Sequence, residues 1–343
     1  MIFKFNKLNN QMSNLTSHIG KILTGLEFKI IFGEIFYKIL NNDLIHNEYQ
    51  YTNGLNICPQ EFNFQQYVTG GLYFCTLENI PIWITDKSAY IVKVQILDDS
   101  IVHVGINKFQ TNKFQIDLTI KCSIFEFEYW SNLEFSKSAV KFNGALLKYI
   151  KLQTPELCEL AVCSNGLALK FIHNQTFKLC ELAIEENYKT LQYVQEQTSD
   201  LCELAVKKNG LALQYVHNQT QYLDELAVKT NGYAIQYVQN PTYDLYKLAV
   251  ESNGLALKYI HNPTSEICIL AVCSNGLALK YVQNQTFEIC KLAIENDSWA
   301  LEHVHDQTYD LCKLAIKYDP MTIIFVKNPT SELIKLANEI QYV

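Results

Sequence analysis

The chain has 343 residues, of which 48% are hydrophobic and 18% are charged, and its formal net charge is -7. This length allows two ordinary domains, or one domain joined to a repeat array. The negative charge disfavours nucleic-acid binding without excluding it, because proteins that hold a phosphate backbone concentrate basic residues on one face.

The 11 cysteines have no close, even spacing of the kind that predicts a disulfide framework. The first residues, Met1–Asn10, lack the pattern of a secretory signal. We therefore expect reduced thiols and a cytoplasmic location.

Residues 1–45 contain the most apolar early stretch, Gly25–Asn42. Its charged residues make this stretch neither long nor apolar enough to cross a bilayer, so we expect no membrane anchor. Ile31, Ile35 and Ile39 are spaced for one side of a helix. The sequence thus predicts a helical N-terminal segment over residues 1–45.

In residues 46–131, alternating apolar runs are separated by turns. Residues 89–97 and 101–106 each alternate apolar and polar side chains around the turn Asp98-Asp99-Ser100, and this pattern predicts a β-hairpin. The pair Gly70-Gly71 predicts a tight turn before a strand and lacks the residues of a phosphate-binding loop. We expect a small α+β module, without a nucleophile, base and orienting residue in one set.

The dominant feature of residues 132–343 is a repeat with a period of 22 residues. The spacing predicts nine full units from about Leu133 to Asn328, and a tenth unit that contains only its first helix. The clearest mark of the repeat is the pair Leu-Ala, which begins at Leu160, Leu182, Leu204, Leu226, Leu248, Leu270, Leu292, Leu314 and Leu336.

Each unit carries start and stop signals for two short helices. A threonine precedes the first helix, where we expect its hydroxyl to accept a hydrogen bond from an amide of the first turn. The pair Asn-Gly, as in Asn209-Gly210, ends this helix, and we expect the glycine to form a left-handed C-cap. The second helix, as in Leu167–His173, is apolar on almost all sides, which predicts packing between neighbouring units.

Helices this short are stable only when they stack on their neighbours. The sequence therefore predicts a mainly α fold, with a right-handed-type α-solenoid of short helix pairs preceded by the small α+β module. The period is not that of ankyrin or tetratricopeptide repeats.

Cysteines recur at one place in the first helix, and metal or redox chemistry is one hypothesis for them. Stacked units would hold successive thiols roughly 8–10 Å apart, too far for a disulfide or a shared zinc ion. We favour small buried side chains instead, and we predict no metal site and no cofactor. The row comprises Cys158, Cys180, Cys202, Cys268, Cys290 and Cys312, with Asp224 at an equivalent place.

An aromatic residue also recurs once in each unit. Repeat proteins that read RNA present one stacking side chain per unit, so base recognition is one hypothesis. Phenylalanine and tyrosine interchange beside aliphatic residues here, which favours core packing with the hydroxyl at the rim. The row comprises Tyr149, Phe171, Tyr193, Tyr215, Tyr237, Tyr259, Tyr281, His303 and Phe325.

Histidine alternates with glutamine at a third place, so that His173, His217, His261 and His305 recur every 44 residues. Histidines two units apart would lie roughly 16–20 Å from each other, which excludes a shared metal ion. A solvated or hydrogen-bonding position is the simpler interpretation, and contact with a ligand is the alternative.

The first helices also carry a row of charges that changes sign along the array. A solvated face is the usual meaning of such charges, but this polarity would also orient a partner or promote head-to-tail self-association. The row runs from Glu159, Glu181, Glu203 and Glu225 to Lys247, Lys291, Lys313 and Lys335.

The strings His46–Ile57, Gly70–Phe74 and Val104–Lys108 resemble the N-terminal module of repeat proteins from Mimivirus-like giant DNA viruses, where it commonly precedes ankyrin arrays. The repeat signature Leu-Ala-Val-x-x-Asn-Gly-Leu-Ala-Leu-x-Tyr-Val is similar to a helical repeat domain of unknown function in the same viruses and some bacteria. The resemblance implies a viral protein in the host cell cytoplasm. It implies no activity and no catalytic residues.

We therefore predict a non-enzymatic scaffold or adaptor that binds a host or viral protein along an extended surface. The alternative is single-stranded RNA binding by the same array, which the net charge opposes. The candidate partner-binding surface comprises Lys148, Lys170, Gln192, Gln214, Gln236, Lys258, Lys280, His173, His217, His261 and His305.

Overall fold

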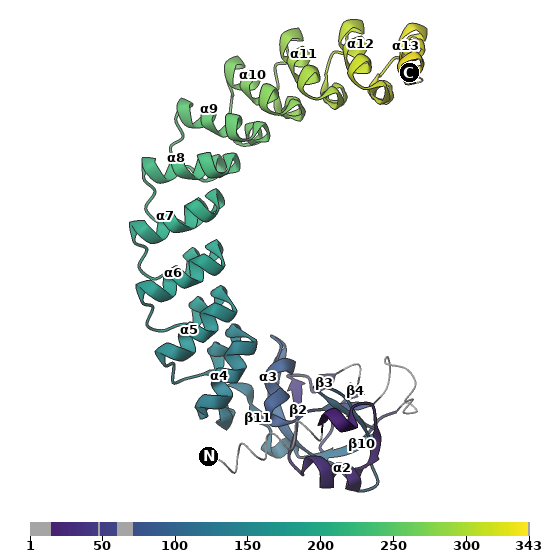
Figure 1. Cartoon of the computed structure of the whole chain (residues 1–343), viewed down its shortest axis with the longest axis vertical. Coiled ribbons are helices and arrows are strands. Elements are labelled where there is room, and N and C mark those ends of the chain that lie inside the picture. Colours follow the sequence, from purple (N-terminus) through teal and green to yellow (C-terminus); the bar gives the residue numbers. More distant parts are fainter. Residues whose placement is uncertain (1–14, 47–48, 60–70, 342–343) are drawn as a thin grey trace. The chain divides into compact units, whose positions relative to one another are not determined.

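The computed structural model of the chain describes residues 15–46, 49–59 and 71–341, and it is β-rich toward the N-terminus and a run of short helices toward the C-terminus (Figure 1). The chain divides into two compact units, residues 1–173 and 174–343. The first unit holds the β-rich module and the first repeats, and the second unit holds the remaining repeats.

In its described residues the module contains two larger sheets and one two-stranded sheet, in which all strand pairs are antiparallel. One sheet has the order β1-β8-β9-β6, and the other has the order β11-β7-β10-β5 with β2 also paired to β7, while β3 and β4 pair separately. The strands are β1 (Ile22–Thr24), β2 (Phe36–Asn41), β3 (Ile45–His46), β4 (Tyr49–Gln50), β5 (Gly54–Ile57), β6 (Leu72–Phe74), β7 (Ser88–Gln95), β8 (Ile101–Val104), β9 (Phe109–Thr111), β10 (Lys113–Ile116) and β11 (Cys122–Ser123). The helices are α2 (Gly25–Phe32), α3 (Ile80–Trp83), and the 3-10 helices η1 (Leu77–Asn79), η2 (Leu118–Ile120), η3 (Ile124–Glu126) and η4 (Glu128–Ser131).

The core of the module is a cluster of phenylalanine rings contributed by α2 and both sheets. Phe28 of α2 is completely buried, and its ring centre lies 4.8–5.7 Å from those of Phe32, Phe36, Phe74 and Phe109. Val92 and Val94 of β7 and Val102 and Val104 of β8 also belong to this cluster. Because residues 28–40 supply part of the same core, the module begins before residue 46.

The predicted helix over residues 25–42 is wrong in its second half. Helix α2 ends at Phe32, and Gly33 follows with a φ of 91°, which favours glycine. The chain then enters β2, which pairs with β7 from Phe36 to Asn41. Pairing with a buried strand overrides the helical spacing of the isoleucines. Residues 1–14 of the predicted N-terminal segment lie outside the described residues.

The predicted β-hairpin is also wrong, although both of its strands exist. Strand β7 has the expected alternation, with Val92 and Val94 buried and Lys93 exposed, but β7 and β8 belong to different sheets. The N-terminus of α2 contacts the turn between them, since Gly25 donates its amide to the carbonyl of Ser100 at 2.7 Å. In the predicted turn before β6, Gly71 has a φ of 91°, while Gly70 lies outside the described residues.

Residues 133–341 alternate ten-residue α-helices with six-residue 3-10 helices and end on α13. The first unit contains α4 (Leu133–Phe142), η5 (Gly144–Tyr149), α5 (Pro155–Ser164) and η6 (Gly166–Phe171). The second contains α6 (Phe177–Glu186), η7 (Tyr188–Tyr193), α7 (Ser199–Lys208), η8 (Gly210–Tyr215), α8 (Gln221–Thr230), η9 (Gly232–Tyr237), α9 (Tyr243–Ser252), η10 (Gly254–Tyr259), α10 (Ser265–Ser274), η11 (Gly276–Tyr281), α11 (Phe287–Asn296), η12 (Ser298–His303), α12 (Tyr309–Tyr318), η13 (Pro320–Phe325) and α13 (Ser331–Gln341).

Within the second unit, consecutive α-helices pack against each other, and so do consecutive 3-10 helices (Figure 1). The contact layer is apolar and repeats with the sequence. In α10 and η11, for example, Ile267, Ala271, Val272, Ala278 and Leu279 are all at most 1% exposed. Short helices are thereby stabilised by their neighbours rather than by their own length.

The predicted threonine caps are confirmed. Thr198, for example, accepts a hydrogen bond from the amide of Leu201 at 3.4 Å. The same bond, at 3.3–3.4 Å, is made by Thr154, Thr176, Thr220, Thr242, Thr264, Thr286, Thr308 and Thr330.

The predicted left-handed glycine cap is wrong, since none of the glycines that open a 3-10 helix of the array has a positive φ. Asn209 ends α7 in extended backbone and caps η8, because its side chain accepts from the amide of Leu211 at 2.9 Å. Gly210 instead permits close packing, as a Cβ there would lie 2.1 Å from the carbonyl oxygen of Ala227 in the next repeat. Tyr188 occupies the place equivalent to Gly210 at the start of η7, so the backbones of neighbouring repeats are less closely packed at that place.

In six of the turns between repeats a glutamine joins the turn to the next one, and the sequence pattern did not identify this role. Gln197 donates its Nε2 to the carbonyl of Tyr215 at 2.8 Å, and its Oε1 accepts from the amide of His217 at 3.0 Å. Equivalent pairs of bonds are made by Gln153, Gln175, Gln219, Gln285 and Gln307. We call these residues the glutamine clamps. Pro241, Pro263 and Pro329 replace them in the other turns.

Candidate functional site

The candidate surface predicted from the repeats forms a regular row in the second unit. Gln192, Gln214, Gln236, Lys258 and Lys280 are all exposed and occupy the same place in successive 3-10 helices. The three glutamines each donate Nε2 to the carbonyl three residues earlier at 2.9 Å. The two lysines place Nζ 5.4 and 4.9 Å from the ring centres of the tyrosines that follow them. Local contacts therefore hold these side chains in place. We call these five residues the polar row.

The two predicted surface residues of the first unit differ from each other. Lys170 is exposed, and its Nζ lies 4.8 Å from the ring centre of Phe171. Lys148 is half-buried and forms an ion pair with Asp86 at 3.3 Å. Lys148 is thus engaged by the β-rich module and is less available to a partner than the prediction assumed.

The histidines of the predicted surface are exposed in both units. Three of them, His173, His217 and His305, donate their backbone amides to glutamine clamps. His261 follows Pro241 by 20 residues, so its amide lies where a clamp is replaced by proline. The backbone amides of these three histidines thus hold neighbouring turns together, whereas the imidazoles are exposed to solvent.

The cysteine row is buried, and burial raises the pKa of each of its thiols, including Cys202 and Cys268. Raised pKa values disfavour the reactive thiolate. Across residues 15–46, 49–59 and 71–341, no group of three or more His, Cys, Asp or Glu side chains has the arrangement of a metal site. The burial of these side chains and the raised pKa values of their thiols fit the packing interpretation of this row.

The aromatic row is half-buried in the second unit. A separate set of exposed aromatic residues, which was not predicted from the sequence, begins several α-helices. Its members are Phe177, Tyr243, Phe287 and Tyr309, which are 41–52% exposed. The sequence pattern that could have identified this set is an aromatic residue directly after a capping threonine. Tyr309 donates its hydroxyl to Glu332 at 3.0 Å, which ties this ring to the next repeat.

The charge row of the α-helices is exposed or half-buried, and several of its charges have local partners. Glu203 pairs with Lys207 and accepts the hydroxyl of Tyr222 at 3.0 Å, and these bonds lower the pKa of Glu203. Lys291 and Lys335 form weaker pairs one turn along their own helices. Local pairing reduces the charge that this row presents to a partner.

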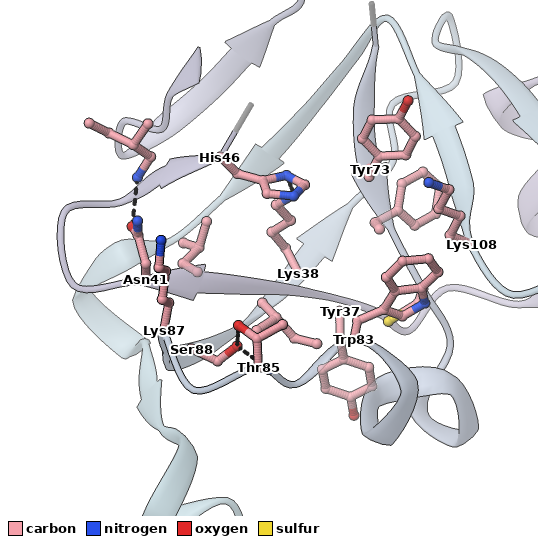
Figure 2. Close-up of a pocket in the computed structure, with 15 residues that line it drawn as sticks. Tyr37, Lys38, Asn41, His46, Tyr73, Trp83, Thr85, Lys87, Ser88 and Lys108 are labelled. Atoms are coloured by element: carbon pink, nitrogen blue, oxygen red, sulfur yellow. Dashed lines mark hydrogen bonds between the residues drawn. The ribbon is translucent and has the colours of Figure 1, made fainter. Parts of the chain in front are cut away.

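A second candidate site lies in the β-rich module, where a pocket of about 490 Å³ opens beside β2 (Figure 2). Lys38 of β2 is 3% exposed, and its Nζ lies 2.9 Å from Nδ1 of His46 at the end of β3. Tyr73, Trp83 and Lys108 lie together along another side of the pocket. We call this cavity the Lys38 pocket.

The Lys38 pocket is basic. Lys38, Lys87, Lys108 and His46 line it, and none of its described lining residues is an aspartate or a glutamate. Burial lowers the pKa of Lys38 to about 7, and Lys108 acts in the same direction, whereas Cys75 opposes this shift. Partial burial lowers the pKa of His46 to about 4, with contributions from Lys38 and Lys108. At neutral pH the histidine is therefore uncharged, and Lys38 is divided between its neutral and ammonium forms.

No family model matches this chain, and no curated protein and no solved structure is detectably similar to it. Among the described residues, no helix combines the length and the apolar character needed to cross a membrane.

The Lys38 pocket was not predictable from the helical spacing of residues 25–42, because that spacing places Lys38 on an amphipathic helix. On a helix this lysine would face solvent, whereas strand alternation places it in the interior. The available signal was the run Phe36-Tyr37-Lys38-Ile39-Leu40, in which a single lysine interrupts an apolar stretch of strand-forming residues.

Proposed function

We propose that the run of helices is an α-solenoid of the right-handed type, and that the protein is a non-enzymatic scaffold or adaptor. In this proposal a protein partner binds along the polar row, with the exposed histidines beside it. The free, buried thiols are compatible with the cytoplasmic location expected from the sequence. A repeat array suits this role because stacked units generate an extended surface from a short repeated sequence.

The observation that carries the proposal is that the side chains of the polar row are held in fixed conformations. Gln192, Gln214 and Gln236 are exposed, yet each is fixed by a bond to its own helix. Binding a side chain that is already ordered loses little conformational entropy. Polar groups at a fixed interval therefore favour recognition of an extended partner.

Single-stranded RNA is the second candidate because lysines of the row lie over aromatic rings. Lys280, for example, lies over Tyr281, which resembles the basic and aromatic pairing of RNA-binding surfaces. The net charge of -7 and the three uncharged glutamines of the row favour a protein partner instead. An RNA complex would weaken steeply as salt is raised.

The test is site-specific photo-crosslinking in the cells that naturally make the protein. A photoreactive residue replaces Gln214 in one variant and Lys229, an exposed residue of α8, in the control. We expect position 214 to give a discrete protein adduct that resists nuclease and is lost when Gln192 and Gln236 are both changed to glutamate. Adducts of equal yield at position 229, or adducts that consist of RNA, would contradict the scaffold proposal.

A further inference from the structure

Lys38 is a buried amine that has no counter-charge among the described residues. Its Nζ contacts Nδ1 of His46 at 2.9 Å and lies 4.8 Å from the ring centre of Tyr51. Within the described part of the chain, no carboxylate forms an ion pair with this Nζ. An isolated buried ammonium costs several kcal/mol, so its protonated form needs an anion from elsewhere.

The surroundings of Lys38 add positive charge rather than neutralise it. Lys108 places its Nζ 4.2 Å from the ring centre of Tyr73 and 4.9 Å from that of Trp83, and Lys87 also lines the cavity. This local charge contrasts with the net charge of -7 for the whole chain. A concave basic site on an acidic protein favours small anions over extended polyanions.

The donor geometry leaves room for a ligand at Lys38. A lysine ammonium has three N–H donors, and the neutral His46 accepts one of them. The remaining donors have no hydrogen-bond partner in the part of the chain that the structure describes, and they can bind oxygen atoms of an anionic group that enters the cavity. The rings of Tyr73 and Trp83 supply an apolar wall, and the volume of about 490 Å³ lies within the usual range of small-molecule sites (Figure 2).

We propose that the Lys38 pocket binds a small organic anion, with a carboxylate or phosphate group that pairs with Lys38 and an apolar body that contacts Tyr73 and Trp83. This site is separate from the polar row and does not depend on the function proposed for it. Binding stabilises the ammonium form of Lys38, so the complex takes up a proton above neutral pH. Among the described residues, the other titratable groups around Lys38 and its pocket are His46, Cys75, Lys87, Lys108, Tyr37, Tyr51 and Tyr73.

The test is isothermal titration calorimetry of the full chain at pH 8 in two buffers that differ in ionisation enthalpy. The probes are phenyl phosphate, benzoate, inorganic phosphate and benzyl alcohol. We expect saturable binding of phenyl phosphate or benzoate with proton uptake, and weaker binding of both the ring-free anion and the neutral ring. The comparison of phosphate with carboxylate identifies the preferred anionic group.

The decisive variant is Lys38→Met, which we expect to weaken binding of the preferred anion by at least about tenfold and to abolish proton uptake. Lys93→Met is the matched control, since Lys93 is an exposed lysine of the same module, and it should change affinity by less than about twofold. Lys108→Met provides a second pocket variant with an exposed side chain, and it should weaken binding without abolishing proton uptake.

Three results of the binding experiments would overturn the proposal, and a fourth result concerns the protein without ligand. The first three are absence of saturable binding for both aromatic anions, equal affinity of the Lys38→Met and Lys93→Met variants, and equal affinity for benzyl alcohol and the anions. Glu48 and Glu61 lie outside the described residues and are tested as Glu48→Gln and Glu61→Gln. If either variant, without ligand, held a smaller protonated fraction of Lys38 than the unchanged protein, that glutamate would be an internal counter-ion of Lys38. This result would also overturn the proposal.

Discussion

At the scale of single residues, Asp224 shows what the cysteine row requires. It occupies the place of a buried cysteine in α8, and its Oδ1 is buried without a hydrogen-bond partner among the described residues. Burial raises the pKa of this carboxyl. A charge in the first helical turn gains about 0.3–1 kcal/mol from the helix dipole, whereas an unsatisfied buried polar group costs about 1–3 kcal/mol. The penalty is therefore the larger effect.

We predict that Asp224→Cys stabilises the protein by about 1 kcal/mol at pH 7, because it removes this penalty. The raised pKa means that the folded state binds more protons than the unfolded state. The gain should therefore be largest above the folded pKa and shrink as the pH falls through it toward the unfolded value. Urea unfolding at several pH values measures this effect. Asp244→Asn, at an exposed site in α9, is the control, and an equal gain there would contradict the prediction.

Lys38 gives a second residue-scale prediction, with the opposite dependence on pH. Its folded pKa of about 7 lies below the usual lysine value, so the unfolded state binds more protons between these two values. Stability should rise with pH in that window. We expect Lys38→Met to remove this dependence and to stabilise the module by about 1–4 kcal/mol at pH 7. Lys93→Met should leave the pH dependence of unfolding unchanged.

Residue-level prediction succeeded where the cause is local. A threonine cap needs only the amides of its own first turn, and the small buried cysteines follow from their spacing. The prediction of a left-handed cap at Gly210 was wrong because glycine is needed there for close packing against the carbonyl of Ala227, which lies in the next repeat. The predicted helical position of Lys38 was wrong for a similar reason, since the burial of Lys38 depends on the pairing of β2 with β7.

At the scale of elements, the turns between repeats are not equivalent. The glutamine clamps supply two hydrogen bonds between successive turns, whereas Pro241 and Pro263 supply neither side-chain bond. A proline restricts the turn itself but does not hold the next one. The two-helix pattern revealed the repeat length, but it did not reveal that the second helix is of the 3-10 type or that glutamine links the turns.

We predict that amide exchange follows the clamps. The amide of His217 is bonded to Gln197, and it should exchange at least about tenfold more slowly than those of His261 and Gln283, which follow the two prolines. Gln197→Ala should raise the exchange rate at His217 and destabilise the protein by about 1–3 kcal/mol. Hydrogen exchange by NMR checks both. Exchange at His261 as slow as at His217 would rule out this role for the clamps.

At the scale of the whole molecule, the chain combines two kinds of core. The β-rich module closes one cluster of phenylalanine rings around Phe28, with partners distant in sequence. The repeats of the second unit share an apolar layer in which each repeat contacts its neighbours, as around Leu279. Periodicity made the second kind predictable from sequence. The first kind was not, because its strand pairs are set by long-range contacts that no local pattern encodes.

Two kinds of core imply two unfolding transitions. Phe28→Leu removes ring contacts of the module and should destabilise it by about 1–2 kcal/mol. Leu279→Ala opens a cavity in the repeat layer and should cost about 2–5 kcal/mol there. Pulse-labelled hydrogen exchange in increasing urea resolves the two regions. Phe28→Leu should lower the midpoint of peptides from residues 88–116 alone, and Leu279→Ala that of peptides from residues 265–304 alone. If either change lowered both midpoints equally, the chain would unfold as one cooperative structure, and the prediction of two separate unfolding transitions would be wrong.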